Sequence, residues 1–120
     1  EITLENSNFR KVLFTGKYCQ LVVMCLKPGE EIGEEVHDNV DQFFRVDSGT
    51  GKVIMNGEEQ IVTDGFAFIV PAGAKHNVIN TSQTEDLKLY TIYSPPNHPD
   101  GTVHKDKAEA DKYEEEHHHH

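Results

Sequence analysis

Short apolar runs, separated by glycine, proline and polar residues, fill the chain between residues 18 and 94. The run over residues 18–27 is rich in strand formers and nearly continuous, which predicts a strand buried on both faces. Further runs predict short strands over residues 42–46, 52–55, 58–62, 66–70, 76–80 and 87–94. Many short strands with this punctuation predict an all-β sandwich or barrel.

Two turns organise the centre of this pattern. Asn56-Gly57 is a strong signal for a two-residue hairpin between two of the runs. At the second turn, Pro71 has no N–H with which to continue a ladder, and Gly73 accepts the positive φ that a tight turn needs. The next strand begins at His76, so we expect this turn to hold the His76 side chain at a barrel mouth, facing inward.

The two ends of the chain are less regular. Residues 2–14 predict one or two edge strands, and residues 97–104 an irregular segment. Residues 105–116 are charged and contain two alanines, so a surface helix and a frayed end both remain open. In the tail, one cluster could cap the barrel mouth and supply an acid or base, or could be a surface loop without a role: His98, Asp100 and His104.

A length of 120 residues argues for one domain. We expect it to span residues 1–116, with a core at 18–94 and a tail at 95–116. The four histidines at 117–120 resemble part of a purification tag and are set aside.

Composition narrows the range of partners. The formal net charge is −10, and residues 30–41 hold six acids and no base, so nucleic-acid binding is disfavoured. No apolar run approaches the roughly 20 residues of a membrane span, and the N-terminus does not resemble a signal peptide.

Cys19 and Cys25 would lie roughly 20 Å apart along one strand and are expected to stay unpaired, most simply as buried core thiols. Two free thiols suit a reducing compartment, and we expect the protein to be cytoplasmic.

Four side chains are candidate metal ligands. Glu35 and His37 flank Val36, so an extended strand would project both from one face, while Gln42 and His76 begin two other strands. A barrel interior could bring the four together, although each alone could be an ordinary surface or loop residue. A carboxylate, two imidazoles and an amide oxygen suit zinc, iron, manganese, nickel or copper.

Two sequence motifs resemble those of the cupin family. In GFAFIVPAGAKHNVIN, residues 65–80, the spacing of glycine, Pro-x-Gly, histidine and asparagine is similar to the second cupin motif. Upstream, PGEEIGEEVHDNVDQFFRVDSG, residues 28–49, resembles the first motif with two departures. Glu35 stands at the position of the first histidine, and Gln42 at that of the glutamate. The resemblance covers residues 22–93.

The resemblance implies a cupin double-stranded β-helix, or jelly-roll barrel, with a short C-terminal tail. The metal ligands of the family correspond to Glu35, His37, Gln42 and His76. Two imidazoles and one carboxylate are the ligand types of the facial triad of non-haem iron sites, and the amide would be a neutral fourth ligand. Asp41 is a rival carboxylate, but its odd offset from Gln42 should point it outward.

The same ligand types occur in cupin phosphomannose isomerases, and small cupins similar to this chain are labelled mannose-6-phosphate isomerase-like. A phosphosugar needs cationic groups, yet Arg45 and Lys75 are expected to face away from the metal. Three hypotheses therefore stay open. The first is a metal-dependent enzyme, either an isomerase of a sugar-like molecule or a dioxygenase. The others are a non-catalytic cupin that binds a small molecule or a metal, and a structural barrel with a degenerate site.

A mostly apolar lining with a metal suits a small organic ligand. The residues expected to share an inward face with Gln42 or His76 are Phe44, Val46, Val78 and Asn80. The aromatic residues whose facing stays open are Phe66, Phe68, Tyr90 and Tyr93. Similar small cupins pair through outer strands, so we also expect a homodimer, with residues 21–26 and the N-terminal strands as candidate edges.

Overall fold

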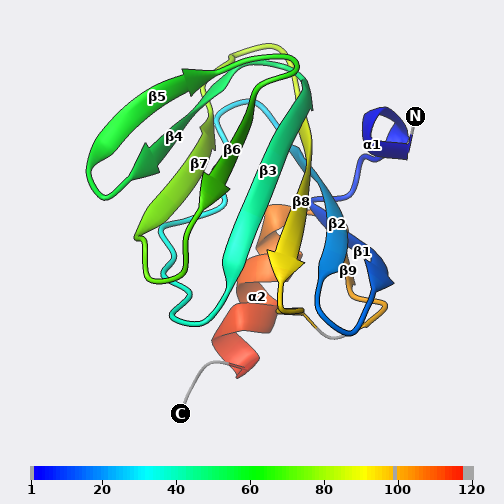
Figure 1. Cartoon of the computed structure of the whole chain (residues 1–120). Coiled ribbons are helices and arrows are strands. Elements are labelled where there is room, and N and C mark those ends of the chain that lie inside the picture. The colour runs from blue at the N-terminus through cyan, green and yellow to red at the C-terminus, as the bar shows by residue number, and fades with distance from the viewer. Residues whose placement is uncertain (1, 99, 118–120) are drawn as a thin grey trace.

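The computed structural model describes residues 2–98 and 100–117, with side chains described as far as residue 112. The last three histidines of the expected tag lie outside this part of the chain. Nine strands form two antiparallel sheets among the described residues, with a short helix at each end of the element order. The sheets lie against each other (Figure 1).

The larger sheet has the strand order β6-β3-β8-β2-β1-β9. Its strands are β1 (Arg10–Thr15), β2 (Gln20–Leu26), β3 (Asp41–Ser48), β6 (Ala67–Val70), β8 (Leu87–Ser94) and β9 (Val103–His104). The smaller sheet has the order β5-β4-β7. Its strands are β4 (Gly51–Met55), β5 (Glu58–Val62) and β7 (His76–Asn80).

The core lies between the inward faces of the two sheets. Burial alternates along β3, β7 and β8, as the period of two along a strand requires. Burial is nearly continuous along β2, as the apolar run over residues 18–27 predicts. Large side chains at the centre include Met24, Leu26, Phe44, Val46, Val78, Leu87 and Leu89. The predicted all-β fold is therefore confirmed.

Both central turns form as their sequences predict. Asn56 and Gly57 have φ values of 51° and 86°, the two positive angles of a type I′ hairpin, and Met55 pairs with Glu58 across them. Gly73 has a φ of 87°. β6 ends at Val70, immediately before Pro71, and β7 begins at His76.

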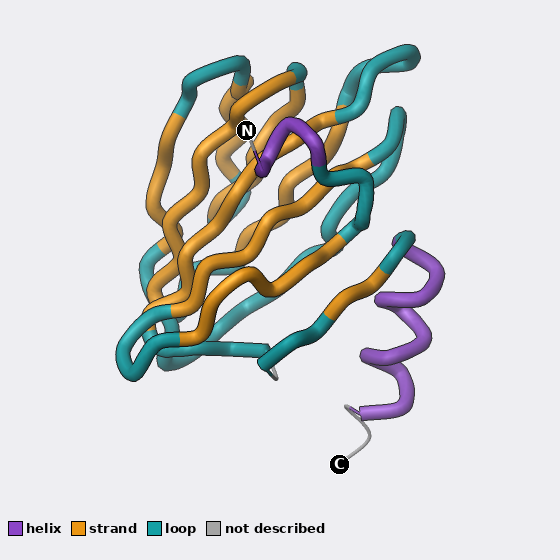
Figure 2. Tube along the Cα trace, turned by 90° about the vertical axis from the view of Figure 1, so that its right-hand side faces the viewer, coloured by secondary structure: helices purple, strands orange, loops and turns teal. Residues whose placement is uncertain are grey.

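The N-terminal prediction is wrong in two respects. Residues 2–5 form the helix α1 (Ile2–Glu5) rather than a strand. This helix lies on the outer face of the larger sheet (Figure 2), where Lys88 Nζ donates to the Leu4 carbonyl at 2.6 Å. β1 is not an edge strand, because β9 pairs with its outer side. β9 lies in the tail predicted to be irregular, and a two-residue strand fixed by a distant partner has no local signal.

The charged C-terminal segment forms the helix α2 (Lys107–His117). Asp106 Oδ1 accepts a hydrogen bond from the Glu109 N–H at 2.8 Å, as an N-cap does. The Ala110 side chain is buried, and Lys107 Nζ reaches the Ile32 carbonyl at 3.5 Å. The helix is therefore docked on the barrel rather than frayed.

Both cysteines are free, as predicted. Cys25 is buried in β2, but Cys19 precedes the strand and is exposed, so it is not a core thiol. The helices of the described chain are too short and too polar to cross a bilayer.

Candidate metal centre

The four predicted ligands come from three parts of the fold. His76 is the first residue of β7, and Gln42 is the second residue of β3. Glu35 and His37 lie in the connection between β2 and β3, which forms only isolated bridges instead of the predicted extended strand. The bridge between Glu35 and His76 fixes the position of this connection beside β7. The Glu35 N–H donates to the His76 carbonyl at 2.8 Å, and the His76 N–H donates back to the Glu35 carbonyl at 2.9 Å.

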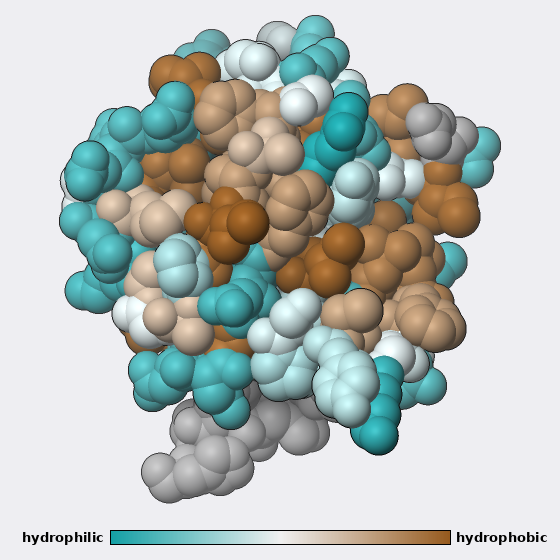
Figure 3. Space-filling model, viewed as in Figure 1, coloured by the Kyte–Doolittle hydropathy of each residue, from teal (hydrophilic) through white to brown (hydrophobic). Residues whose placement is uncertain are grey.

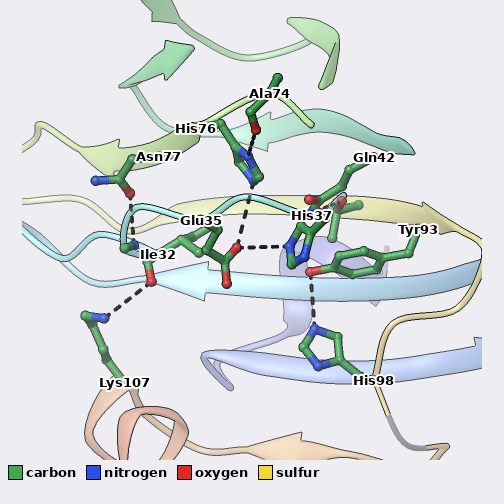
Figure 4. A network of polar contacts seen from close by, with 12 residues as sticks. Ile32, Glu35, His37, Gln42, Ala74, His76, Asn77, Tyr93, His98 and Lys107 are labelled. Carbon is green, nitrogen blue, oxygen red and sulfur yellow. Dashed lines mark hydrogen bonds and ion pairs between the residues drawn. The ribbon is translucent and has the colours of Figure 1, made fainter. Parts of the chain in front are cut away.

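This pairing brings three side chains together (Figure 4). Glu35 Oε1 lies 3.5 Å from His37 Nε2 and 3.8 Å from His76 Nε2. Their potential ligand atoms all lie within 4.8 Å of one another. One carboxylate and two imidazoles thus converge on one region of the barrel interior.

The His76 ring is oriented by its own turn. Its Nδ1 lies 3.2 Å from the Ala74 carbonyl, which can only accept, so we assign the ring proton to Nδ1. The lone pair is then on Nε2, the atom that faces Glu35. A backbone carbonyl that fixes the tautomer in this way is typical of metal-binding histidines.

Gln42 is also oriented. Its Nε2 donates to Thr91 Oγ1 at 3.0 Å, and its Oε1 is buried without a hydrogen-bond partner among the described residues. Its cross-strand partner on β8 is Tyr93, whose ring lies 6.1 Å from that of His37. The next inward residue on β3 is Phe44, whose ring lies 6.3 Å from that of His76. The amide is therefore flanked by neighbours of both histidines.

Unsatisfied polar atoms mark the same region. Among the described side chains, the buried nitrogen and oxygen atoms without a hydrogen-bond partner are Arg10 Nε, His37 Nε2, Gln42 Oε1 and His76 Nε2. Leaving such atoms unpaired in a protein interior is costly. Three of them belong to predicted ligands, and a divalent cation is the kind of partner that lone pairs of this type accept. The donor set fits a borderline metal ion.

The protonation states suit metal binding. Burial would raise the pKa of Glu35, but the contact with His37 and the charges of Arg10 and His76 outweigh it and lower the pKa. Burial lowers the pKa of His76, only partly offset by the Ala74 carbonyl and Glu35. Near neutral pH the carboxylate is therefore charged and the His76 imidazole neutral, as metal ligands must be.

The predicted tail cluster is divided by the structure. His98 lies next to the centre, with Nε2 3.2 Å from the hydroxyl of Tyr93. Burial, together with the Arg10 charge, lowers the pKa of His98 to about 3, so its ring is neutral near pH 7. Asp100 is exposed, and His104 lies on β9, 3.2 Å from an Arg10 nitrogen.

The predicted facing of most other residues is confirmed. The inward residues that are buried as expected are Phe44, Val46, Val78 and Asn80. Phe68 stacks on Phe44 at 4.8 Å and Tyr93 is buried, whereas Tyr90 contacts Phe43 on the outer face. Asp41 points outward and accepts a hydrogen bond from the Ala72 N–H. Arg45 and Lys75 are exposed, as predicted.

Sequence reasoning missed Arg10. Its side chain is only 3% exposed, and its charge acts on both Glu35 and His98. The alternation of Arg10 with the buried Val12 was a readable signal that both face inward.

A cavity of about 360 Å³ reaches the strand of His76 from outside. It is lined by Glu34, Ile54, Asn56, Gly57, Lys75, His76 and Asn77. Of the three converging ligands, His76 is among its lining residues, whereas Glu35 and His37 are not.

Comparisons with known proteins agree with the fold. The model of the Cupin domain family matches residues 22–93. The uncharacterized protein YrkC of Bacillus subtilis is 52% identical over 114 residues, which cover 90% of this chain and 61% of that protein. The uncharacterized protein L612 of Acanthamoeba polyphaga mimivirus is 43% identical over 107 residues, covering 86% of this chain and 66% of that protein. The chain thus spans less than two thirds of either relative. The crystal structure of BH2720 from Bacillus halodurans superimposes with a TM-score of 0.90 at 44% identity, over 92% of this chain and 88% of that one.

Proposed function

The chain belongs to the cupin family, and from this we propose that it binds one divalent metal ion and uses it to act on a small organic molecule. The ligands in this proposal are Glu35, His37, Gln42 and His76. The observation that carries it is that the potential ligand atoms of Glu35, His37 and His76 lie within 4.8 Å of one another. His37 Nε2 and His76 Nε2, like Gln42 Oε1, are buried and have no hydrogen-bond partner among the described residues.

When bound, the metal supplies a Lewis acid that polarises an oxygen of the ligand or activates water or dioxygen. The chain supplies the rest of the site. Glu35 neutralises one of the two metal charges, and Gln42 adds an oxygen without adding charge. Ala74 and Thr91 hold His76 and Gln42 in the required orientation.

Isomerisation of a sugar-like hydroxycarbonyl compound is the first reaction to test. Arg45 and Lys75 face outward, so neither supports binding of a sugar phosphate. The second is an oxygen-dependent reaction, which is favoured by the two imidazoles and one carboxylate, the ligand types of non-haem iron oxygenases. A non-catalytic cupin that binds a small molecule or the metal alone is the alternative.

The first experiment measures metal content by mass spectrometry in protein lacking the terminal histidines, which bind the same metals. Wild type should retain about one ion per chain. The metal-loaded protein is then incubated with a panel of hydroxycarbonyl compounds, in air and without oxygen. Turnover in both conditions indicates an isomerase, and turnover in air alone an oxygenase. Binding without turnover would leave the non-catalytic alternative, and absence of metal would overturn the proposal.

We also propose that the protein is a homodimer paired through the outer face of the larger sheet. Apolar side chains gather on this face (Figure 3). Strand register places five of them in one row across β6, β3, β8, β2 and β1: Ile69, Phe43, Ile92, Leu21 and Phe14. Ile69 and Phe14 are 61% and 64% exposed. The same face carries Lys11, Arg45 and Lys88 against Asp41 and Asp47, so it does not share the excess negative charge of the chain.

Sedimentation at micromolar concentration tests the pairing. Ile69→Glu should shift the protein toward the monomer. Ile61→Glu is the matched control, because Ile61 on β5 is equally exposed but lies on the other sheet. A monomeric wild type would reject the proposal.

A further inference from the structure

Three polar residues form one buried row across the centre of the larger sheet. Gln20 on β2 is opposite Tyr93 on β8, and Tyr93 is opposite Gln42 on β3. All three are at most 2% exposed. Gln42 is one of the proposed metal ligands, so strand pairing places Tyr93 directly beside the candidate metal centre. The Tyr93 hydroxyl is a polar group that the proposed ligand set does not use.

The Gln20 side chain fixes the backbone of the tail beside Tyr93. Its Oε1 accepts hydrogen bonds from the N–H groups of Asn97 and His98, at 3.1 and 2.9 Å. Its Nε2 donates to the His98 carbonyl at 2.7 Å and to Thr15 Oγ1 at 2.9 Å. These four contacts use the full hydrogen-bonding capacity of the amide. The buried glutamine therefore holds His98 in one position.

The Tyr93 side chain lies between this fixed histidine and the metal centre (Figure 4). His98 Nε2 is 3.2 Å from the Tyr93 hydroxyl oxygen, and the centres of the two rings are 5.1 Å apart in an edge-on contact. On the other side, the centre of the Tyr93 ring is 6.1 Å from that of the His37 ring, again edge-on. Tyr93 is therefore a neighbour of two proposed ligands, of His37 through its ring and of Gln42 through strand pairing.

Packing alone does not favour a buried pair of a tyrosine and a histidine. Burying a hydroxyl and an imidazole removes the hydration of both groups, and their mutual contact offsets only part of that cost. Apolar residues of similar shape would fill the same space without this penalty. A phenol hydroxyl has one proton and two lone pairs, so it can contact His98 and bind a second polar group at the same time. The arrangement suits a hydroxyl that is oriented toward a ligand.

We propose that Tyr93 binds the organic ligand of the metal centre, through a hydrogen bond between its hydroxyl and an oxygen atom of that ligand. This rests on the proposed metal site and adds a specificity-determining residue to it. The class of ligand that fits is a small molecule with two neighbouring oxygen atoms, such as an α-hydroxycarbonyl compound. One oxygen faces the metal and the other faces Tyr93. Gln20 and His98 are positioning residues, because they act on the ligand only through the Tyr93 hydroxyl.

The test uses the chain without its terminal histidines, loaded with Co²⁺, whose visible spectrum reports binding at the metal. Acetohydroxamate is the probe with two neighbouring oxygens, and imidazole is the matched probe that binds metal ions through nitrogen and offers no oxygen. Tyr93→Phe keeps the ring beside His37 and removes only the hydroxyl. It should weaken acetohydroxamate binding about fivefold, as expected for the loss of one hydrogen bond. The imidazole affinity and the Co²⁺ content should stay unchanged.

Tyr90→Phe is the matched control. Tyr90 lies on the same strand but contacts Phe43 on the outer face, so both probes should bind this variant as they bind wild type. His98→Gln should weaken acetohydroxamate binding less than Tyr93→Phe, because an amide can still contact the hydroxyl. When added to Tyr93→Phe, it should have no further effect, since the hydroxyl that His98 positions is then absent. A histidine that only supports the fold would have the same effect in both backgrounds.

The outcomes separate the two proposals. If wild type takes up no Co²⁺, the metal site is wrong and this inference falls with it. If Co²⁺ binds but acetohydroxamate does not, or if acetohydroxamate binds Tyr93→Phe as it binds wild type, only the role of Tyr93 is overturned. Equal weakening of both probes by Tyr93→Phe would indicate a general disturbance of the centre and would also overturn that role.

Discussion

Two segments supply three of the four proposed ligands of the candidate metal centre, and they hold their side chains by different means. Residues 65–80 place His76 at the start of β7, directly after the turn at Pro71 and Gly73, and its ring is buried and hydrogen-bonded locally. Residues 28–40 place Glu35 and His37 in a connection with no strand of its own.

Residues 28–40, the first segment, take their shape from residues 65–80, the second segment. The backbones of Glu35 and His76 pair in both directions, and the Gly73 N–H donates to the His37 carbonyl at 2.7 Å. The Gly33 N–H donates to Asn77 Oδ1 at 2.9 Å. The positions of Glu35 and His37 therefore depend on residues 73–77. Changes in the second segment should disturb the whole centre, whereas changes in the first should act locally.

The largest effect is expected for His76→Ala. It removes one imidazole and leaves a cavity beside Phe44, so most bound metal should be lost and the free energy of unfolding should fall by about 2–4 kcal/mol. Metal content by mass spectrometry and urea unfolding measure the two effects. Lys75→Ala, an exposed neighbour, is the control. Unchanged metal content in His76→Ala would refute the assignment.

As the pH falls, the free energy of unfolding of the metal-free protein should decrease first through His76 of the second segment and His98 of the tail, and only later through Glu35. The folded-state pKa values of His76 and His98 lie below 6.5, so the unfolded chain takes up more protons as the pH falls from 6.5. Stability is therefore lost as the pH falls below 6.5, with about 3 kcal/mol from His98 between pH 7 and pH 4. The lowered pKa of Glu35 contributes stability above pH 4.5 that is lost only as the pH falls through its folded value.

Urea unfolding at pH 7, 6, 5 and 4 measures this profile. His98→Gln should flatten it below pH 6.5, because glutamine does not titrate. A variant with the slope of wild type would show that His98 is protonated in the fold.

Gln42 offers a change of ligand charge without a change of shape. Gln42→Glu should tighten metal binding about tenfold and lower the stability of the metal-free protein by about 1 kcal/mol, since a second carboxylate then faces Glu35. Gln42→Ala should lose less metal than His76→Ala, because a neutral amide is the weakest of the four donors. Competition against a chelator measures the affinities. Weaker binding by the glutamate variant would indicate that repulsion between the two anions dominates.

The smallest effect is expected for Asp41→Ala. It removes the hydrogen bond from the Ala72 N–H that ties the start of β3 to the turn of the second segment. Stability should fall by about 0.5–1.5 kcal/mol while metal content stays unchanged. Loss of metal here, with none in Gln42→Ala, would move the fourth ligand by one residue and reverse the assumed facing of β3.

The ligands on strands could be predicted from local sequence, whereas the conformation of the segment that holds the other two could not. His76 and Gln42 were placed inward from a turn and a period of two, and both are buried. Glu35 and His37 were expected on one face of a strand that does not form. They converge nonetheless, because β7 imposes the pairing on a segment with little structure of its own.

By itself, the sequence determined the features whose causes lie within a few residues. Asn56-Gly57 fixes its hairpin by backbone conformation, Pro71 ends β6, and apolar alternation fixes which side of β3 and β7 is buried. Only the tertiary structure decided the features made by distant partners. β9 exists because it pairs with β1, and this pairing brings His104 Nδ1 to 3.2 Å from an Arg10 nitrogen. Such contacts join residues more than 90 positions apart, and no local pattern encodes the energy that they contribute.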